Sequence, residues 1–208
     1  MTDTPFLRRS HWAEVEENPP PSKSLYRWGP EMKTDERFDG PGPDGASACP
    51  HCGAEGVGGA AGCNEVFQDV VGREFTRPEL FQVHRLTVDA YSLQHPDQYM
   101  KSAKSAVAHL TGMCWAMEHD DDPFVSMAIS RFLDGTPDVT KPQSIPAPGK
   151  RGSMTIVDIF LATDSEEHLE GVRAWAREVW QAWSDHHAQA RMWLEEAKGL
   201  ARFRNGGR

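Results

Sequence analysis

The sequence predicts an all-α fold, a helical bundle that follows an N-terminal cysteine-rich loop. Apolar residues after position 63 recur at intervals of three and four, which is the spacing of amphipathic helices. Several of these segments begin with residues that favour a helix start. No segment alternates apolar and polar residues as a half-buried strand does. Together these observations favour a bundle over a fold that contains a sheet.

The first two helices are predicted on either side of position 76. Residues 64–75 carry four apolar side chains at helical spacing: Val66, Phe67, Val70 and Val71. Thr76 is suited to cap the next helix, Pro78 fits its first turn, and Glu79 completes a capping box. This second helix is expected to run to about His95, which a proline follows.

Two further helices are predicted in the middle of the chain. Asp97 is suited to cap a helix over roughly residues 101–118, whose inward positions are Ala106, Val107, Leu110, Met113 and Met117. The pair Asp122-Pro123 opens a shorter helix that ends near Leu133. A proline-rich loop then occupies residues 135–152.

The C-terminal part is predicted to hold a short helix and the longest one. Residues 155–158 form a capping box and start a short helix that ends near Ala162. Residues 163–166 start a helix that runs to about Leu200. Acidic residues crowd its first turn and basic ones its end, as the helix dipole prefers.

Length and composition separate an arm from a domain. The 208 residues suit one domain with an extension. Seven of the fifteen prolines lie in residues 1–47, where no hydrophobic periodicity is present. This segment is therefore predicted to be a proline-rich extension. Residues 48–204 are predicted to form the domain, which combines the cysteine-rich loop with the bundle.

Charge and hydropathy argue against several function classes. The 22 Lys+Arg and 31 Asp+Glu give a net charge of −9. This argues against nucleic-acid and anionic-membrane partners, because phosphates select positive surfaces. The sequence contains no run of about 18 apolar residues, so no transmembrane helix is predicted. The first residues do not resemble a signal peptide, so the expected location is the cytoplasm. Phosphate-loop and zinc-protease motifs do not occur in the sequence.

The cysteines predict a zinc knuckle. Cys49, Cys52 and Cys63 form a C-x2-C-x10-C pattern, and in a reducing compartment this spacing favours metal over a disulfide. Three thiolates need a fourth ligand for tetrahedral zinc. The two helices around position 76 should run antiparallel and bring Cys63 level with residues 90–95. His95 is therefore the expected fourth ligand. The alternative is that the cysteines are free thiols in a loop.

Three further histidines are candidates for a second metal site. Counting along antiparallel helices places His84 and His109 within a turn of each other, and His187 extends the inward stripe of the last helix. Three imidazoles can hold a second divalent metal and leave a position open for water or substrate, with Asp89 or Tyr91 as a further ligand or supporting partner. Alternatively each is a core histidine bonded to a neighbour. A single site that mixes the Cys and His groups is a further possibility.

The other histidines and the fourth cysteine are expected to play no part in a metal site. His186 is predicted to be solvated or to support a neighbouring ligand. Cys114 is predicted to be a buried, inert thiol on its helix. Three histidines are expected at the surface: His11, His119 and His168.

Four blocks of sequence, together with Cys63 between the first two, carry the candidate ligands singled out above. They read CPHCG at 49–53, VHRLTVDAYSLQHP at 83–96, SAVAHL at 105–110 and WQAWSDHH at 180–187. In this order they resemble a bacterial helical domain family of unknown function, over about residues 48–198. The resemblance implies no named activity. A bundle that draws histidines from several helices is also similar, in architecture alone, to the DinB-like metal-dependent thiol transferases.

Three functions are compatible with the sequence. The first is a zinc-binding helical-bundle protein in which the cysteine cluster holds a structural zinc. The second is a metal-dependent enzyme, a transferase or hydrolase acting on a small molecule at the three-histidine site. The third is a protein–protein interaction module that uses the acidic surface and the proline-rich arm. The sequence names no catalytic residue, so whether the protein is an enzyme is left open.

Overall fold

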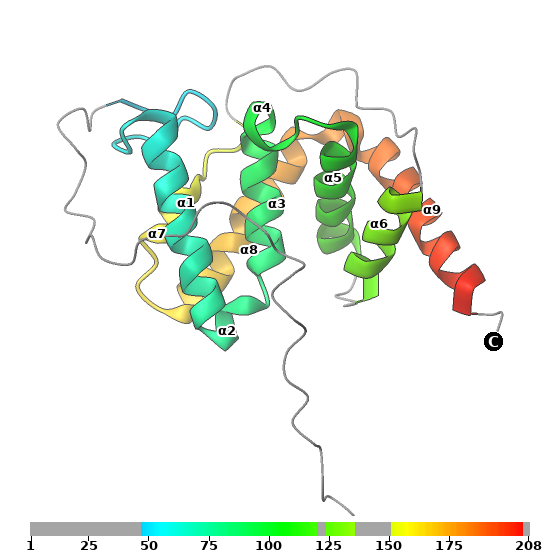
Figure 1. Cartoon of the computed structure of the whole chain (residues 1–208). Coiled ribbons are helices and arrows are strands. Elements are labelled where there is room, and N and C mark those ends of the chain that lie inside the picture. The colour runs from blue at the N-terminus through cyan, green and yellow to red at the C-terminus, as the bar shows by residue number, and fades with distance from the viewer. Residues whose placement is uncertain (1–46, 120–123, 136–150, 206–208) are drawn as a thin grey trace, which may run out of the picture. The chain divides into compact units, whose positions relative to one another are not determined.

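The computed structural model describes residues 47–119, 124–135 and 151–205, and within these ranges all regular secondary structure is helical (Figure 1). The prediction of an all-α fold is thereby confirmed for the described residues. The predicted extension lies outside them except for its last residue. Within the described ranges, no helix combines the length and the apolar character needed to cross a membrane.

The N-terminal helices form a layer that begins directly after the cysteine-rich loop. Helix α1 contacts α3, and the short α2 connects them at one end, so that the chain returns antiparallel (Figure 1). Helix α4 follows α3 at the opposite end and leads to the next long helix. The bounds are α1 Gly59–Thr76, α2 Pro78–Phe81, α3 His84–Gln94 and α4 Pro96–Tyr99.

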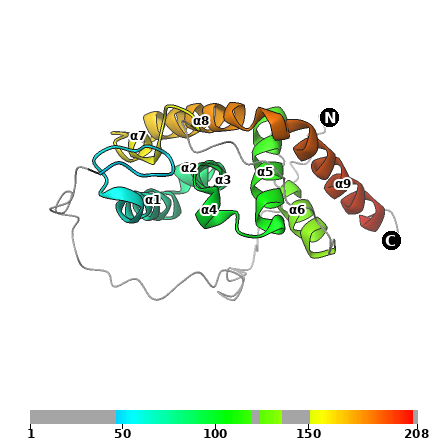
Figure 2. The ribbon, with the colours of Figure 1, turned by 90° about the horizontal axis from the view of Figure 1, so that it is seen from above.

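The remaining helices extend this layer and cover one side of it. Helix α8 packs across α3 and reaches α5, while α7 packs against α1 (Figure 2). Helix α9 packs against α5 and α6. The bounds are α5 Ala103–Glu118, α6 Phe124–Gly135, α7 Ile156–Phe160, α8 Ser165–Ala182, the 3-10 turn η1 Ser184–His186 and α9 His187–Asn205.

One continuous apolar core joins these helices. Its largest fully buried side chains include Trp175 and Trp183 at the α8 side and Tyr91 on α3. Trp183 also donates its indole N–H to the backbone oxygen of Leu93 at 3.2 Å, which satisfies the polar edge of a buried ring. The junction of α8 and η1 is therefore fixed to the C-terminal end of α3.

The helix predicted from residue 78 to about His95 is two helices. Helix α2 ends at Phe81 and α3 begins at His84. The residue between the two that faces inward is Val83, which is buried together with Leu80. Neither glycine nor proline occurs between α2 and α3, so the break follows from packing rather than from a helix-breaking residue.

The predicted long C-terminal helix is also interrupted. Helix α8 ends at Ala182, η1 turns the chain, and α9 begins at His187. His187 therefore starts a new helix and does not continue the inward stripe of α8. The expectation that His186 is solvated is wrong, because its side chain is buried beside Trp183.

The predicted capping residues were correct for α7 but not for α2 or α5. Thr155 and Asp158 form the expected capping box at α7. Thr76 does not cap α2, because its hydroxyl donates to the backbone oxygen of Arg73 in the preceding helix. Asp97 lies within α4, and α5 is capped by Ser102. The predicted start at residues 122–123 lies outside the described residues.

Candidate metal centre

The cysteine-rich loop folds into a tight turn that presents two thiols to the same side. The amide of Gly53 donates to the oxygen of Cys49 at 2.9 Å, and the amide of Cys49 donates to the oxygen of Ala54 at 2.8 Å. Gly53 adopts a φ of 78°, a left-handed conformation that glycine accepts without steric cost. Cys49 and Cys52 are both buried.

The third cysteine comes from α1 and not from the loop. Helix α1 begins at Gly59, five residues before the predicted start, so Cys63 lies near its first turn and is buried. The amide of Gly59 donates to the oxygen of Ser47 at 3.0 Å, which ties the start of the loop to the start of the helix. The thiol of Cys63 therefore projects from a helix toward the two thiols of the turn.

His95 enters the same cluster from the C-terminal end of α3. Its Nδ1 lies 2.8 Å from the backbone oxygen of Tyr91, and because a carbonyl only accepts, Nδ1 carries the proton. Nε2 is then unprotonated and faces the sulfurs of Cys49 and Cys63, each at 3.5 Å. The ring stacks on Tyr91 with centroids 3.9 Å apart. This arrangement orients the imidazole in the way that protein metal sites do.

The four side chains form a group that could hold a metal ion. The ligand atoms of Cys49, Cys52, Cys63 and His95 all lie within 4.8 Å of one another, and all four residues are buried. The sulfurs of Cys52 and Cys63 are 3.7 Å apart, far beyond the length of a disulfide bond. The antiparallel counting that selected His95 from the sequence agrees with this grouping.

The hydrogen bonds among the three thiols shift their pKa values in opposite directions. Hydrogen bonds from Cys52 and then Cys63 hold the pKa of Cys49 far below its usual value. The hydrogen bond with Cys49 raises the pKa of Cys52 to about 11 and is also the main cause that raises the pKa of Cys63. A bound divalent cation would displace the remaining thiol protons, as metal binding to cysteine does.

A buried arginine connects the cluster to a distant part of the chain. Arg151 donates from Nη1 to the backbone oxygens of Gln94 and His51, at 2.8 and 3.2 Å. The side-chain amide of Gln94 donates in return to the oxygens of Arg151 and Met154, both at 2.9 Å. Burial lowers the pKa of Arg151. Arg151 could not be selected from the sequence, since its partners lie 57 and 100 positions away.

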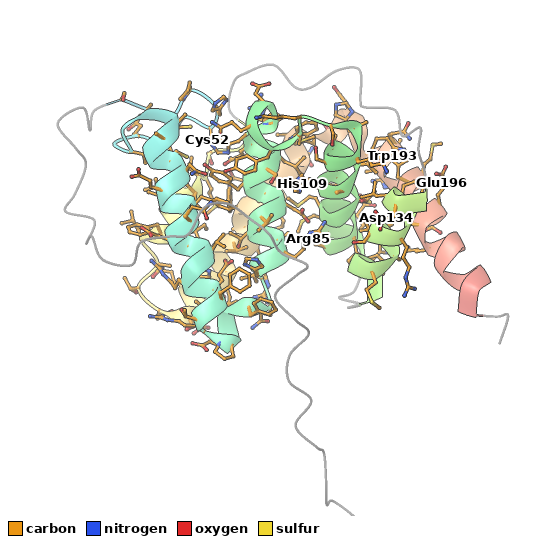
Figure 3. The ribbon with its side chains drawn as sticks, in the orientation of Figure 1. Cys52, Arg85, His109, Asp134, Trp193 and Glu196 are labelled. Atoms are coloured by element: carbon orange, nitrogen blue, oxygen red, sulfur yellow. The ribbon has the colours of Figure 1, made fainter. Side chains whose placement is uncertain are left out.

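The structure does not bring His84, His109 and His187 together. His84 bonds to Glu74 and His109 to Asp89, each through Nδ1. His187 bonds through Nε2 to the backbone oxygen of Trp180 and stacks on its ring. Figure 3 shows His109 beside Arg85 in the region between α3 and α5, well apart from Cys52. Within the described residues, the cysteine–histidine cluster is the group whose ligand atoms converge.

Sequence reasoning missed a buried carboxylate and, besides His186, misplaced His168. His168 was expected at the surface, but it is buried on α8 and its Nε2 lies 3.0 Å from Glu74. A signal was present: His168 precedes Val172 by four residues and Trp175 by seven, so it shares their buried face. Glu74 follows Val70 by four residues and shares its buried face on α1. His119 is exposed, as expected, and His11 lies outside the described residues.

A family model matches this chain over residues 47–184, about two thirds of its length, and its description is a family of unknown function, DUF5946. The chain belongs to this family. The DUF5946 match contains all four residues of the cluster and also Glu74, His84 and His168. It ends before α9. Neither the curated proteins nor the solved structures gave a match to this chain.

Proposed function

We propose that this DUF5946 protein binds one structural zinc ion through Cys49, Cys52, Cys63 and His95. The zinc would fasten the cysteine-rich loop to α1 and to the end of α3. The chemistry of the donors supports zinc, because three thiolates and one imidazole form a common tetrahedral zinc set. The proposal includes a reducing compartment such as the cytoplasm, because the thiols must stay unpaired.

The observation that carries the proposal is the set of distances between the ligand atoms. A tetrahedral zinc with Zn–S of about 2.3 Å and Zn–N of about 2.0–2.1 Å has S···S separations of about 3.8 Å and S···N separations of about 3.5 Å. The corresponding S···S distance between Cys52 and Cys63 is 3.7 Å. Both S···N distances to His95 are 3.5 Å. The donors therefore already have the spacing that zinc requires.

Closure of the group supports a structural role over a catalytic one. Catalytic zinc usually has three protein ligands and leaves the fourth position to water or substrate. Here four protein ligands converge and all are buried. The hydrogen bond from Nδ1 of His95 fixes the ring in its ligating orientation. The zinc would act by cross-linking the chain.

The proposal is tested by zinc content in two matched variants. Cys52→Ser removes one ligand and is expected to lower zinc from one ion per chain to well below it. Cys114→Ser removes a buried thiol outside the cluster, whose pKa burial raises to about 12, and should keep one zinc. Elemental analysis of the purified proteins measures both. Equal zinc in the wild type and Cys52→Ser contradicts the proposal.

A second readout separates ligand loss from unfolding. Cobalt(II) that replaces zinc in a tetrahedral thiolate site gives intense visible and charge-transfer absorption bands. His95→Cys would keep four ligands and should shift these bands while retaining metal. Bands identical to those of the wild type would show that His95 is not a ligand.

A further inference from the structure

A second polar cluster lies in the bundle, apart from the cysteines, around the carboxylate of Glu74. This side chain is 0 % exposed. Its Oε1 accepts from Nε2 of His168 at 3.0 Å and from the hydroxyl of Thr87 at 2.5 Å, and its Oε2 accepts from Nδ1 of His84 at 3.0 Å. Burial acts to raise the pKa of Glu74, but the hydrogen bonds from His168, His84 and Thr87 outweigh it and lower the pKa. Glu74 is therefore an anion in the protein interior.

His168 also donates to this anion. It is 1 % exposed, and its Nδ1 is buried without a hydrogen-bond partner. An ionised carboxylate only accepts, so the nitrogen that bonds to Oε1 of Glu74 at 3.0 Å, Nε2, carries a proton. Among the described residues, Glu74 forms no ion pair with a lysine or an arginine.

His84 is the member of this cluster that reaches the surface. Its side chain is 18 % exposed. The Nδ1 proton is committed to Glu74, so Nε2 carries the free electron pair, and no described residue forms a hydrogen bond with it. When Nε2 takes a proton, the new positive charge faces a buried anion that no described lysine or arginine pairs with. This is how a carboxylate orients an imidazole and stabilises it as a general base.

Two exposed aromatic rings flank the same imidazole. Phe81 lies nearly parallel to the ring of His84, with an interplanar angle of 6° and centroids 5.5 Å apart. The centroid of Phe75 lies 4.2 Å from it. Phe75 is 63 % exposed and Phe81 is 53 % exposed, although both are large and apolar. The base is thus bordered by an aromatic surface that can hold an apolar group of a ligand.

We propose that His84 is a general base for the hydrolysis of an acyl ester whose apolar group lies against Phe75 and Phe81. Nε2 takes a proton from water as the water oxygen attacks the carbonyl carbon. The bond to the leaving oxygen then breaks, the leaving group departs as an anion, and the imidazolium returns its proton to solvent. The substrate class follows from the cluster: apart from the imidazolium that the reaction itself forms, no described proton donor contacts Nε2, so an ester whose leaving group departs as a stable anion suits the site best. Aryl esters meet this requirement. The inference is independent of the metal centre.

The test uses the zinc-loaded full chain and p-nitrophenyl butyrate as the probe. His84→Asn is expected to lower kcat/KM by about 100-fold or more, the contribution typical of a general base. Phe81→Ala is expected to raise KM several-fold with little change in kcat, because it removes binding surface alone. The wild-type rate should rise with pH to a plateau and be slower in D2O, since a proton moves in the rate-determining step.

His119→Asn is the matched control for adventitious imidazole reactivity. His119 is exposed and stacks on an aromatic ring, that of Trp115, but its hydrogen bond is to Lys198 and not to a carboxylate. This variant should hydrolyse the probe at the wild-type rate. The proposal is overturned by any one of three results. These are an unchanged kcat/KM in His84→Asn, an equal loss of kcat/KM in His119→Asn, or equal rates in H2O and D2O. An unchanged KM in Phe81→Ala would overturn the placement of the apolar group, and because Phe81 is exposed this variant should still fold.

Discussion

The lack of a side chain at Gly112 allows α5 to lie close to α3. It lies on α5 opposite α3, where Asp89 and Arg85 occupy the space beside its α-carbon. A β-carbon at this position would overlap Oδ2 of Asp89 and lie 2.7 Å from Nη2 of Arg85. Asp89 cannot easily move aside, because its two oxygens accept from His109 at 2.8 Å and from Arg85 at 2.7 Å. Glycine is required here by packing, since no left-handed backbone is involved.

Replacement of Gly112 by alanine is therefore expected to destabilise the protein. The overlap should cost about 1–3 kcal/mol, the usual range for overpacking a core. Gly72→Ala in α1 is the control, because a β-carbon there meets no atom within 4 Å. It should stabilise the helix by up to about 1 kcal/mol. Urea denaturation of both variants measures the difference, and the same sign of change in the two would contradict this explanation.

At the level of residues, spacing predicted the cluster but not the partners of the other histidines. The pattern of Cys49, Cys52 and Cys63 is local, and His95 follows from counting along two adjacent helices. The partner of His168 lies 94 positions away in the chain, and no periodicity connects such distant residues. Its burial was nevertheless visible in the helical pattern of α8. Burial can therefore be predicted from sequence more readily than hydrogen-bond partners.

At the level of elements, α5 depends on a cap that the sequence reading did not select. The hydroxyl of Ser102 accepts from the amide of Ser105 at 3.0 Å, and the side chain of Ser105 accepts from the amide of Ser102 at 3.2 Å. This reciprocal pair satisfies two amides that the helix leaves unbonded. The usual capping box has Glu or Gln in the later position, which explains why two serines were not recognised.

Loss of this cap should weaken α5 measurably. Ser102→Ala is expected to lower the free energy of unfolding by about 1 kcal/mol. Thr76→Ala is the matched control, because the hydroxyl of Thr76 bonds back to its own helix and caps nothing. Its effect should stay within about 0.5 kcal/mol. Thermal or urea unfolding compares the two. No loss in Ser102→Ala would contradict its role as the cap of α5, and a loss of about 1 kcal/mol in Thr76→Ala would show that Thr76 caps α2.

The two helix breaks explain why element boundaries were predicted less well than element types. Periodicity identified helical segments throughout the described residues, but it continued across both breaks. No glycine or proline marks either position. At the second break, the contact that fixes the chain is the hydrogen bond from Trp183 to Leu93 on another helix. Tertiary packing of this kind overrides a local pattern and cannot be read from it.

At the level of the whole molecule, the cysteine–histidine cluster that we propose as a zinc site lies beside one continuous core. It joins the cysteine-rich loop, α1 and the end of α3, and Arg151 extends the connection to residues 151–154. Helices α6 and α9 contact α5 and each other, and contribute no residue to the centre. Loss of the proposed metal should therefore lower the local stability of some parts of the fold more than that of others.

Removal of the proposed zinc by a chelator is expected to increase hydrogen exchange first in residues 47–58 and 151–154. The amides of Cys49, Gly53 and Gly59 should lose protection, because their bonds hold the turn that carries the ligands. Amides in α5 and α9 should remain protected. Hydrogen-exchange mass spectrometry with and without chelator measures the change. Uniform loss of protection across all helices would mean that the centre and the bundle unfold as one unit.

The cluster also has a consequence for the unfolded chain. Cys49 and His95 are 46 positions apart, so the proposed metal would close a long loop that contains α1, α2 and α3. Closing such a loop removes conformational entropy from the unfolded ensemble, as a disulfide of similar span does. Unlike a disulfide, this closure depends on the concentration of free metal, because a ligand that binds the native state stabilises it by mass action. The amount of folded protein in a cell would then vary with the supply of metal.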